Sequence, residues 1–119
     1  FDKYIGIGKP CYINGDRISP LEAIAIIIKA KGIPVLAHPY IMGKDELIPK
    51  FIKAGLRGIE VYHSDHNEAA VRHYKKMTED FGLFATGGSD CHGMGKGKML
   101  MGTVTVPYDV VEQLKAATR

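Results

Sequence analysis

The sequence predicts an α/β protein with mostly parallel strands and flanking helices. Short apolar runs bounded by Gly or Pro, typical of buried strands, alternate with longer segments of helical periodicity. Helix-start and helix-stop residues separate these segments at regular places. Strict alternation of this kind indicates a mostly parallel sheet or a part of a barrel. With 119 residues, the chain suits one domain, residues 1–119.

The first part of the chain combines an irregular segment with a well-marked helix. Residues 1–18 are rich in Gly, Pro and turn formers, so we expect an irregular N-terminal segment. Ser19-Pro20-Leu21-Glu22 then predicts a helix start, with Ser as the cap, Pro in the first position and Glu in the third. The helix should run to about Lys31 and end at Gly32. Because its interior is apolar on more than one face, we expect it to be covered on both sides.

The rest of the chain alternates between the two types of element. Apolar runs that are short and rich in β-branched residues are read as strands, and runs at helical spacing as helices. The sequence predicts strands at 33–39, 56–63, 83–86 and 102–106, and helices at 44–54, 65–81 (opened by a capping box at Asp65–Glu68) and 107–117.

Composition limits the classes of function. A net charge of +3 is compatible with an anionic substrate but is too weak to indicate a DNA-binding face. The longest apolar run, 23–28, is too short to span a bilayer, and the N-terminus shows neither a signal peptide nor a Met, so we expect it to continue a longer protein. Cys11 and Cys91 do not form a disulfide framework, which favours a cytoplasmic setting.

Residues capable of chemistry follow each of the first three strands. Ser89-Asp90-Cys91-His92 places a carboxylate and an imidazole two residues apart, on one side of an extended segment, as ligands for a divalent metal. His38 follows the first strand, and Glu60 and His63 lie on the second. Parallel strands bring these ends to one edge of the sheet. The sequence therefore predicts a metal-dependent hydrolase.

Simpler interpretations remain for each residue alone. His38 can be a buried histidine bonded to a carbonyl, and Glu60 an edge residue or an ion-pair partner. His63 can be a loop or cap residue, which is the preferred interpretation for His66. His73 is expected at the surface and Cys91 in a packing role. Gly93 to Lys98 does not match a phosphate-binding loop, although Lys96 there can attract anions.

With these residues in view, the chain resembles the C-terminal part of a PHP (polymerase and histidinol phosphatase) domain of the TrpH-like metal-dependent phosphoesterase type. The resemblance is carried by residues 4–13, 19–24, 36–39, 58–63 and 86–93. It implies a partial (β/α) barrel of the PHP type, whose N-terminal half lies outside this chain together with the opening His-x-His motif. It also implies two or three divalent ions (Zn, Mn or Fe) in the complete domain.

The resemblance also implies roles for individual residues. His38, Asp90 and His92 resemble metal ligands, with Asp90 and His92 the catalytic pair. Glu60 and His63 are expected to contact either a metal-ligating residue or the substrate. Where relatives often carry an Arg after Ala-His-Pro, this chain has Tyr40 to Lys44, so Lys44 is the expected substitute phosphate contact. Apart from the resemblance, Lys96 in the glycine-rich loop is a candidate substrate contact, with a plain surface loop as the alternative.

The expected function is a phosphatase acting on small phosphates or nucleotides, as part of a longer protein. An exonuclease acting on a nucleic-acid end is chemically close. A non-catalytic fragment and another barrel metallohydrolase, such as an amidohydrolase, are the alternatives. Because half a barrel leaves strand edges unpaired, we also expect self-association or pairing with the missing N-terminal half, and inactivity of the chain alone.

Overall fold

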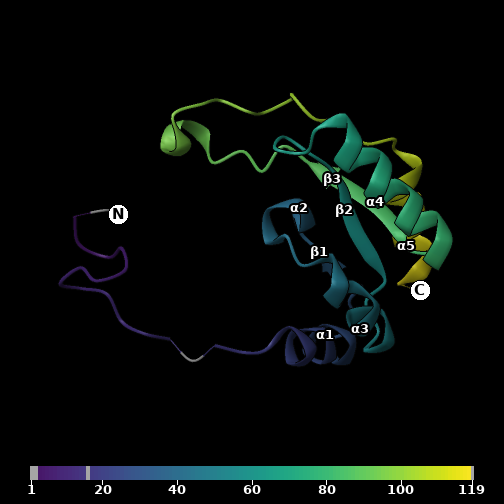
Figure 1. Ribbon diagram of the computed structural model, residues 1–119, viewed down its shortest axis with the longest axis horizontal. Helices are drawn as coiled ribbons and strands as arrows, with labels where there is room; N and C mark the ends of the chain where they lie inside the picture. The colour runs from purple at the N-terminus through teal and green to yellow at the C-terminus, as the bar shows by residue number, and fades with distance from the viewer. Residues whose placement is uncertain (1–2, 16, 119) are drawn as a thin grey trace.

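The computed structural model describes residues 3–15 and 17–118, which form an α/β arrangement around one small sheet (Figure 1). The strands are β1 (Val35–Leu36), β2 (Gly58–His63) and β3 (Phe84–Gly88). All pairings are parallel and the order is β1-β2-β3. The predicted α/β class with parallel strands is confirmed, whereas three strands do not establish a barrel.

The described residues form four helices of six or more residues: α1 (Pro20–Lys29), α3 (Ile48–Lys53), α4 (Glu68–Phe81) and α5 (Asp109–Ala117). Shorter turns of helix are α2 (Pro39–Met42), η1 (Asp45–Leu47) and η2 (Gly93–Lys96). The capping box of α1 is confirmed, because the Ser19 hydroxyl accepts from the Glu22 N–H (3.2 Å) and the Glu22 carboxylate accepts from the Ser19 N–H (2.7 Å). Residues 3–15, 17 and 18 are irregular, as expected.

The start of α4 differs from the prediction. The cap is Asn67, whose side-chain oxygen accepts from the Ala70 N–H at 2.9 Å. Asp65 instead lies in the turn before it. The predicted capping box at Asp65–Glu68 is therefore wrong, because the helix begins two residues later, where the Asn67 side chain reaches a free amide group.

The core lies between β2 and the helices α3 and α4. Ile48, Ile59, Val61, Ala70 and Tyr74 form one buried cluster. A second, smaller cluster joins α1 to α3 through Ile24, Phe51 and Leu56. Ile59 and Val61 of the central strand β2 therefore pack against the helices. The strand residues that point to the opposite face of the sheet remain available for a site.

The molecule is less compact than a typical domain of the same length. Its radius of gyration is 16.1 Å, whereas about 13.5 Å is typical of a compact domain of this size. In Figure 1 the N-terminal segment and the loop after β3 both extend away from the sheet. Two regions, rather than a uniform expansion, account for the excess.

Three sequence predictions about strands and helices are wrong in detail. Residues 102–106 form turns and irregular backbone instead of a fourth strand, and in the described chain they do not pair with the open edge of β3. The strand predicted at 33–39 shrinks to β1, because Pro34 and Pro39 flank it and have no N–H to donate. The helix predicted at 44–54 begins as η1 and becomes α3 near Pro49.

Helix α1 is covered on one side only. Ile24 is buried, whereas Ile26 is 55% exposed and Ile28 is 46% exposed. The expectation of cover on both sides is therefore wrong for this chain, because within the described residues the sheet ends at β1. No helix among the described residues has the length and apolar character to cross a membrane.

Candidate metal centre

The predicted site residues lie along one edge of the sheet, after the carboxyl ends of the strands. The rings of His38 and His63 are 5.8 Å apart, centroid to centroid. His63 Nε2 lies 3.9 Å from Asp90 Oδ2, and His92 Nδ1 lies 3.8 Å from Asp90 Oδ1. The structure thus brings His38, His63, Asp90 and His92 into one continuous row.

Glu60 holds the backbone at His38. Its carboxylate accepts a hydrogen bond from the His38 N–H at 2.8 Å. His38 has a left-handed conformation (φ 32°, ψ 57°), which is rare for a residue with a side chain and unfavourable before a proline. Conformations of this kind persist where surrounding contacts hold them, often at functional sites. His38 is exposed rather than a buried histidine bonded to a carbonyl.

A bulge in β2 places Glu60 and His63 on the same face of the sheet. In a regular strand, residues three apart point to opposite faces. The register with β3 shifts between Glu60 and Tyr62, so Glu60 pairs with Thr86 whereas His63 pairs with Gly88. Both side chains then reach His38, one through its N–H and one through its ring. Bulges commonly redirect side chains in this way beside active sites.

Gly87 makes the bulge sterically feasible. A Cβ on Gly87 would lie 2.5 Å from the Tyr62 Cβ and still closer to the Tyr62 carbonyl oxygen. Only glycine lets the two backbones approach this closely. The glycine pair after β3 therefore has a packing reason at its first position, and Gly88 has open space around it.

Asp90 and His92 meet through a turn and not through an extended segment. β3 ends at Gly88, and Asp90 has a positive φ of 48°. The prediction that residues i and i+2 share a side of a strand is wrong here, although the two side chains do lie close together. The His92 Nδ1 donates to the Asp90 carbonyl oxygen at 2.7 Å. This hydrogen bond between a side chain and the backbone stabilises the turn from within.

His63 lies in a different environment from Asp90 and His92. The side chain of His63 is 0% exposed, whereas those of Asp90 and His92 are 35% and 50% exposed. The Asp65 N–H donates to His63 Nδ1 at 3.1 Å. His63 Nε2 is buried and has no hydrogen-bond partner among the described residues.

The other predicted residues take peripheral positions. Lys44 Nζ lies 4.0 Å from Glu46 Oε1 at the surface, and the side chain of Lys96 lies outside the described part of the structure. The Cys91 thiol contacts Met99, as a packing role requires. Backbone N–H groups of Gly93 and Leu100 lower the pKa of this thiol. Cys11 and Cys91 are both free.

His66 has more contacts than the sequence suggested. Its Nδ1 donates to the Val61 carbonyl oxygen at 2.8 Å, and its ring lies 5.2 Å from that of His63 and 5.5 Å from that of Tyr74. His66 lies in the loop before α4, which agrees with the loop interpretation, and Asn67 rather than His66 caps the helix. The sequence offered no signal for this contact, which depends on where β2 turns after His63.

The row of side chains does not form a complete metal site by itself. Among the described residues, no three His, Cys, Asp or Glu side chains are grouped closely enough to hold a metal ion. The donor types nevertheless fit a divalent ion, because carboxylate oxygen and imidazole nitrogen are the ligands that zinc, manganese and iron share. The free Nε2 of His92 fits as well, since its Nδ1 proton is used by the Asp90 carbonyl.

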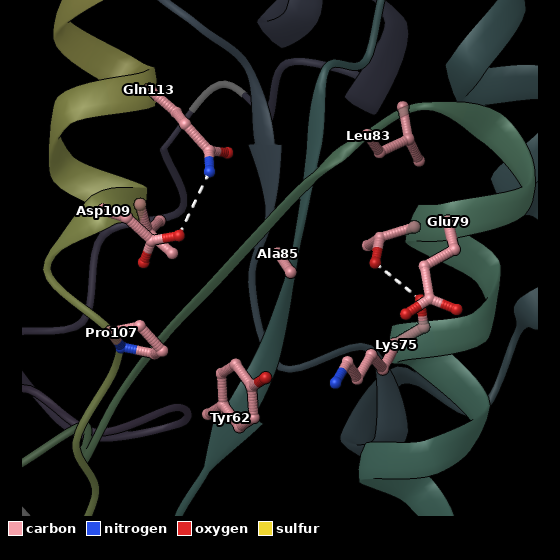
Figure 2. Close-up of a pocket in the computed structure, with 10 residues that line it drawn as sticks. Tyr62, Lys75, Glu79, Leu83, Ala85, Pro107, Asp109 and Gln113 are labelled. Atoms are coloured by element: carbon pink, nitrogen blue, oxygen red, sulfur yellow. Dashed lines mark hydrogen bonds between the residues drawn. The ribbon is translucent and has the colours of Figure 1, made fainter.

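Two hollows of the molecule lie away from this row. A cavity of about 240 Å³ lies between α4, α5 and β3, with Tyr62, Lys75 and Gln113 among its lining residues (Figure 2). A smaller apolar groove of about 150 Å³ runs along β1 and α1. Neither hollow includes the predicted metal ligands.

No protein-family model matches the chain. Two characterised relatives do. A 3',5'-nucleoside bisphosphate phosphatase of Chromobacterium violaceum is 37% identical over 102 residues, which cover 82% of this chain and 36% of that protein. A phosphoribosyl 1,2-cyclic phosphate 1,2-diphosphodiesterase of Eggerthella lenta is 34% identical over 86 residues, covering 72% of this chain and 33% of that protein.

Two crystal structures have the same arrangement of elements. An amidohydrolase from Chromobacterium violaceum, with bound sulfate and no metal, matches 98% of this chain and 43% of its own, at a TM-score of 0.69 and 29% identity. A protein of Bifidobacterium adolescentis described as a metal-dependent phosphoesterase matches 94% of this chain and 41% of its own, at a TM-score of 0.76 and 30% identity.

This chain spans between 33% and 43% of the length of these four proteins. The sequence similarity extends over most of this chain, and the fold similarity over nearly all of it. Both similarities agree with the resemblance drawn from residues 36–39, 58–63 and 86–93. The comparisons are therefore consistent with this chain being a fragment of a PHP-type domain.

Proposed function

We propose that this chain supplies one side of the metal centre of a metal-dependent phosphoesterase. The observation that carries the proposal is the row of His38, Asp90 and His92 at the carboxyl edge of a parallel sheet. Catalytic groups of α/β enzymes gather at this edge. The relatives named phosphatase and phosphodiesterase give the reaction class.

His38, Asp90 and His92 are the proposed metal ligands, and zinc, manganese or iron the proposed ions, two or three in a complete domain. A bound divalent ion supplies a lowered pKa for a water molecule and a positive charge against phosphate oxygens. Asp90 and His92, which are partly exposed, are the proposed catalytic pair. Asp90 would orient the attacking water, and His92 is held for this by its bond to the Asp90 carbonyl.

The remaining polar residues have supporting positions. Glu60 fixes the backbone of His38, and His63 lies between His38 and Asp90. Lys44 is exposed, so it is free to reach an anionic group beyond its contact with Glu46. We keep Lys44 and Lys96 as the proposed contacts for substrate phosphate.

The proposed substrate is a phosphorylated small molecule or a nucleotide. The names of the two relatives both describe phosphate esters built on a ribose or nucleoside. Hydrolysis at a nucleic-acid end uses the same chemistry and is the second candidate. The free cysteines Cys11 and Cys91 agree with a cytoplasmic setting.

The experiment compares this chain with the polypeptide that continues upstream of Phe1 in its reading frame. Both are assayed for p-nitrophenyl phosphate hydrolysis with Mn²⁺ and Zn²⁺, and for metal content by mass spectrometry. We expect activity in the longer polypeptide alone, and loss of activity and of metal in Asp90→Ala. Asp80→Ala, an exposed carboxylate on α4 that pairs with Lys76, is the matched control. An inactive longer polypeptide whose metal content is unaffected by Asp90→Ala contradicts the proposal.

The uncovered side of the molecule bears on the chain's partners. The apolar groove along β1 and α1 includes Ile27, Leu36 and Phe51, and β1 pairs with β2 on one side only in the described chain. Such an edge invites another strand. We propose that the chain covers it by self-association or by pairing with an upstream half. A monodisperse monomer in sedimentation would contradict this.

A further inference from the structure

We infer that His63 is a positioning residue for Asp90 and is not itself a metal ligand. In this role its Nε2–H group donates to the Asp90 carboxylate, on the side away from the catalytic face. The inference rests on the proposed function, because it takes Asp90 as a ligand. The inference names the ring nitrogen of His63 that carries the proton and the group that receives it. The sequence alone allowed either a contact with the substrate or a contact with a metal-ligating residue.

The tautomer of His63 follows from its neighbour in the chain. A backbone N–H can only donate, so His63 Nδ1, which receives the Asp65 N–H at 3.1 Å, carries no proton. In a neutral imidazole the proton then lies on Nε2. A metal needs a lone pair on the ligating nitrogen. The nitrogen of His63 that faces Asp90 has a hydrogen there instead.

His92 has the opposite tautomer. A carbonyl oxygen can only accept, so His92 Nδ1, which lies 2.7 Å from the Asp90 carbonyl oxygen, carries the proton. Its Nε2 therefore presents a lone pair. The two histidines beside Asp90 thus differ in kind: His92 is prepared to bind a cation, and His63 is prepared to donate to a carboxylate.

The position of His63 agrees with this role. Its side chain is 0% exposed, which leaves no route for substrate to reach it directly. Nε2 lies 3.9 Å from Asp90 Oδ2 and has no hydrogen-bond partner among the described residues. A buried donor without a partner is unfavourable, and approach to ~2.9 Å would satisfy it.

The bulge in β2 directs His63 toward Asp90. Without the register shift between Glu60 and Tyr62, His63 would point toward α4 rather than toward Asp90. Gly87 leaves space for the shift. Groups that hydrogen-bond a ligating carboxylate fix its orientation, and their loss typically weakens metal binding by about 10- to 100-fold.

The first test measures the tautomers directly. Nitrogen-15 NMR of histidine-labelled chain, without metal, assigns the protonated ring nitrogen of each histidine. We expect the proton of His63 on Nε2 and that of His92 on Nδ1. A proton on His63 Nδ1 overturns the inference.

The second test measures Mn²⁺ affinity in the polypeptide extended upstream. His63→Gln keeps an amide N–H near the position of Nε2, whereas His63→Leu has no donor. We expect His63→Leu to weaken Mn²⁺ binding by about 10- to 100-fold, and His63→Gln to restore most of it. Equal loss in both variants, as large as the loss in His92→Ala, shows that His63 is a ligand and overturns the inference.

Two controls keep these outcomes separate. If His63→Leu does not fold, as judged by thermal melting, His63→Asn replaces it, because its amide mimics Nδ1 and leaves Asp90 without a donor. His63→Asn should then lose affinity where His63→Gln does not. A wild-type polypeptide that binds neither Mn²⁺ nor Zn²⁺ overturns the proposed function instead, while the NMR result still decides the tautomer.

Discussion

The end of β2 and the turn after β3 supply neighbouring parts of the same site but are built in different ways. At the end of β2 the backbone is paired with β3, and the side chain of His63 is fully buried. After β3 the chain leaves the sheet, and Asp90 and His92 are 35% and 50% exposed. One side of the row is fixed by packing, and the other is held by a local turn.

This difference separates two tasks. The β2 end orients groups that need no contact with substrate: Glu60 fixes the backbone of His38, and His63 faces Asp90. The β3 turn presents the groups that would meet a metal and a phosphate. Preorganised supports behind exposed ligands are what precise sites require. Variants that disturb each region should therefore differ in kind and in size.

The largest expected effect comes from the core beneath β2. Ile59 is 0% exposed in the main cluster, so Ile59→Ala should lower the free energy of unfolding by about 2–5 kcal/mol. Met101, in the loop after β3, is 75% exposed, and Met101→Ala should change it by less than about 0.5 kcal/mol. Urea denaturation followed by circular dichroism measures both. Similar losses in the two variants would remove the contrast between packed strand and open loop.

A smaller effect, with a sharper structural meaning, comes from the glycine pair at the end of β3. A Cβ at Gly87 would meet the Tyr62 backbone, whereas a Cβ at Gly88 would have open space around it. The two substitutions are therefore a matched pair at adjacent positions. Gly87→Ala should cost about 1–3 kcal/mol by overpacking and should displace His63. Gly88→Ala should be close to neutral.

The readouts for this pair are the unfolding free energy and the chemical shifts of the His63 ring. If Gly87→Ala leaves both unchanged, the bulge does not depend on the glycine. A Gly88→Ala variant as damaged as Gly87→Ala would show that the whole turn, and not one close approach, is sensitive.

The sequence predicted the type and order of most elements because their signals are local. The cap at Ser19, the glycine after α4 and the β-branched residues of β2 each act within a few positions. The same reasoning placed His38, Glu60, His63 and the Asp90 turn at one edge, since parallel strands share a direction. Local chemistry and topology were sufficient for that much.

Features that depend on partners in space were not predicted. The β-branched residues 103–106 suit a strand, but in the described chain they do not pair with β3, whose outer edge stays open. The bulge at Glu60–Tyr62 requires the contact with Gly87, which lies 25 residues or more along the chain. The tautomers of His63 and His92 depend on single hydrogen bonds that no sequence pattern indicates.

The smallest expected effect concerns Tyr74, which packs in the core beneath β2 and joins α4 to η1. Tyr74 is 2% exposed, and its hydroxyl donates to Asp45 Oδ1 at 2.9 Å. Tyr74→Phe should cost about 1 kcal/mol at neutral pH through loss of this bond. Tyr108→Phe, at a 68% exposed tyrosine, is the matched control and should be neutral.

The pH dependence of this contribution has a definite sign. Burial raises the pKa of Tyr74, and the hydrogen bond to Asp45 raises it further. The stabilisation is therefore complete below the unfolded-state pKa of about 10 and is lost as pH rises above it. Between pH 9 and about 11, wild type should lose stability faster than Tyr74→Phe, so the gap between them narrows. Parallel curves would show that Tyr74 ionises as an exposed tyrosine does, and that the β2 side is less firmly packed than its buried core implies.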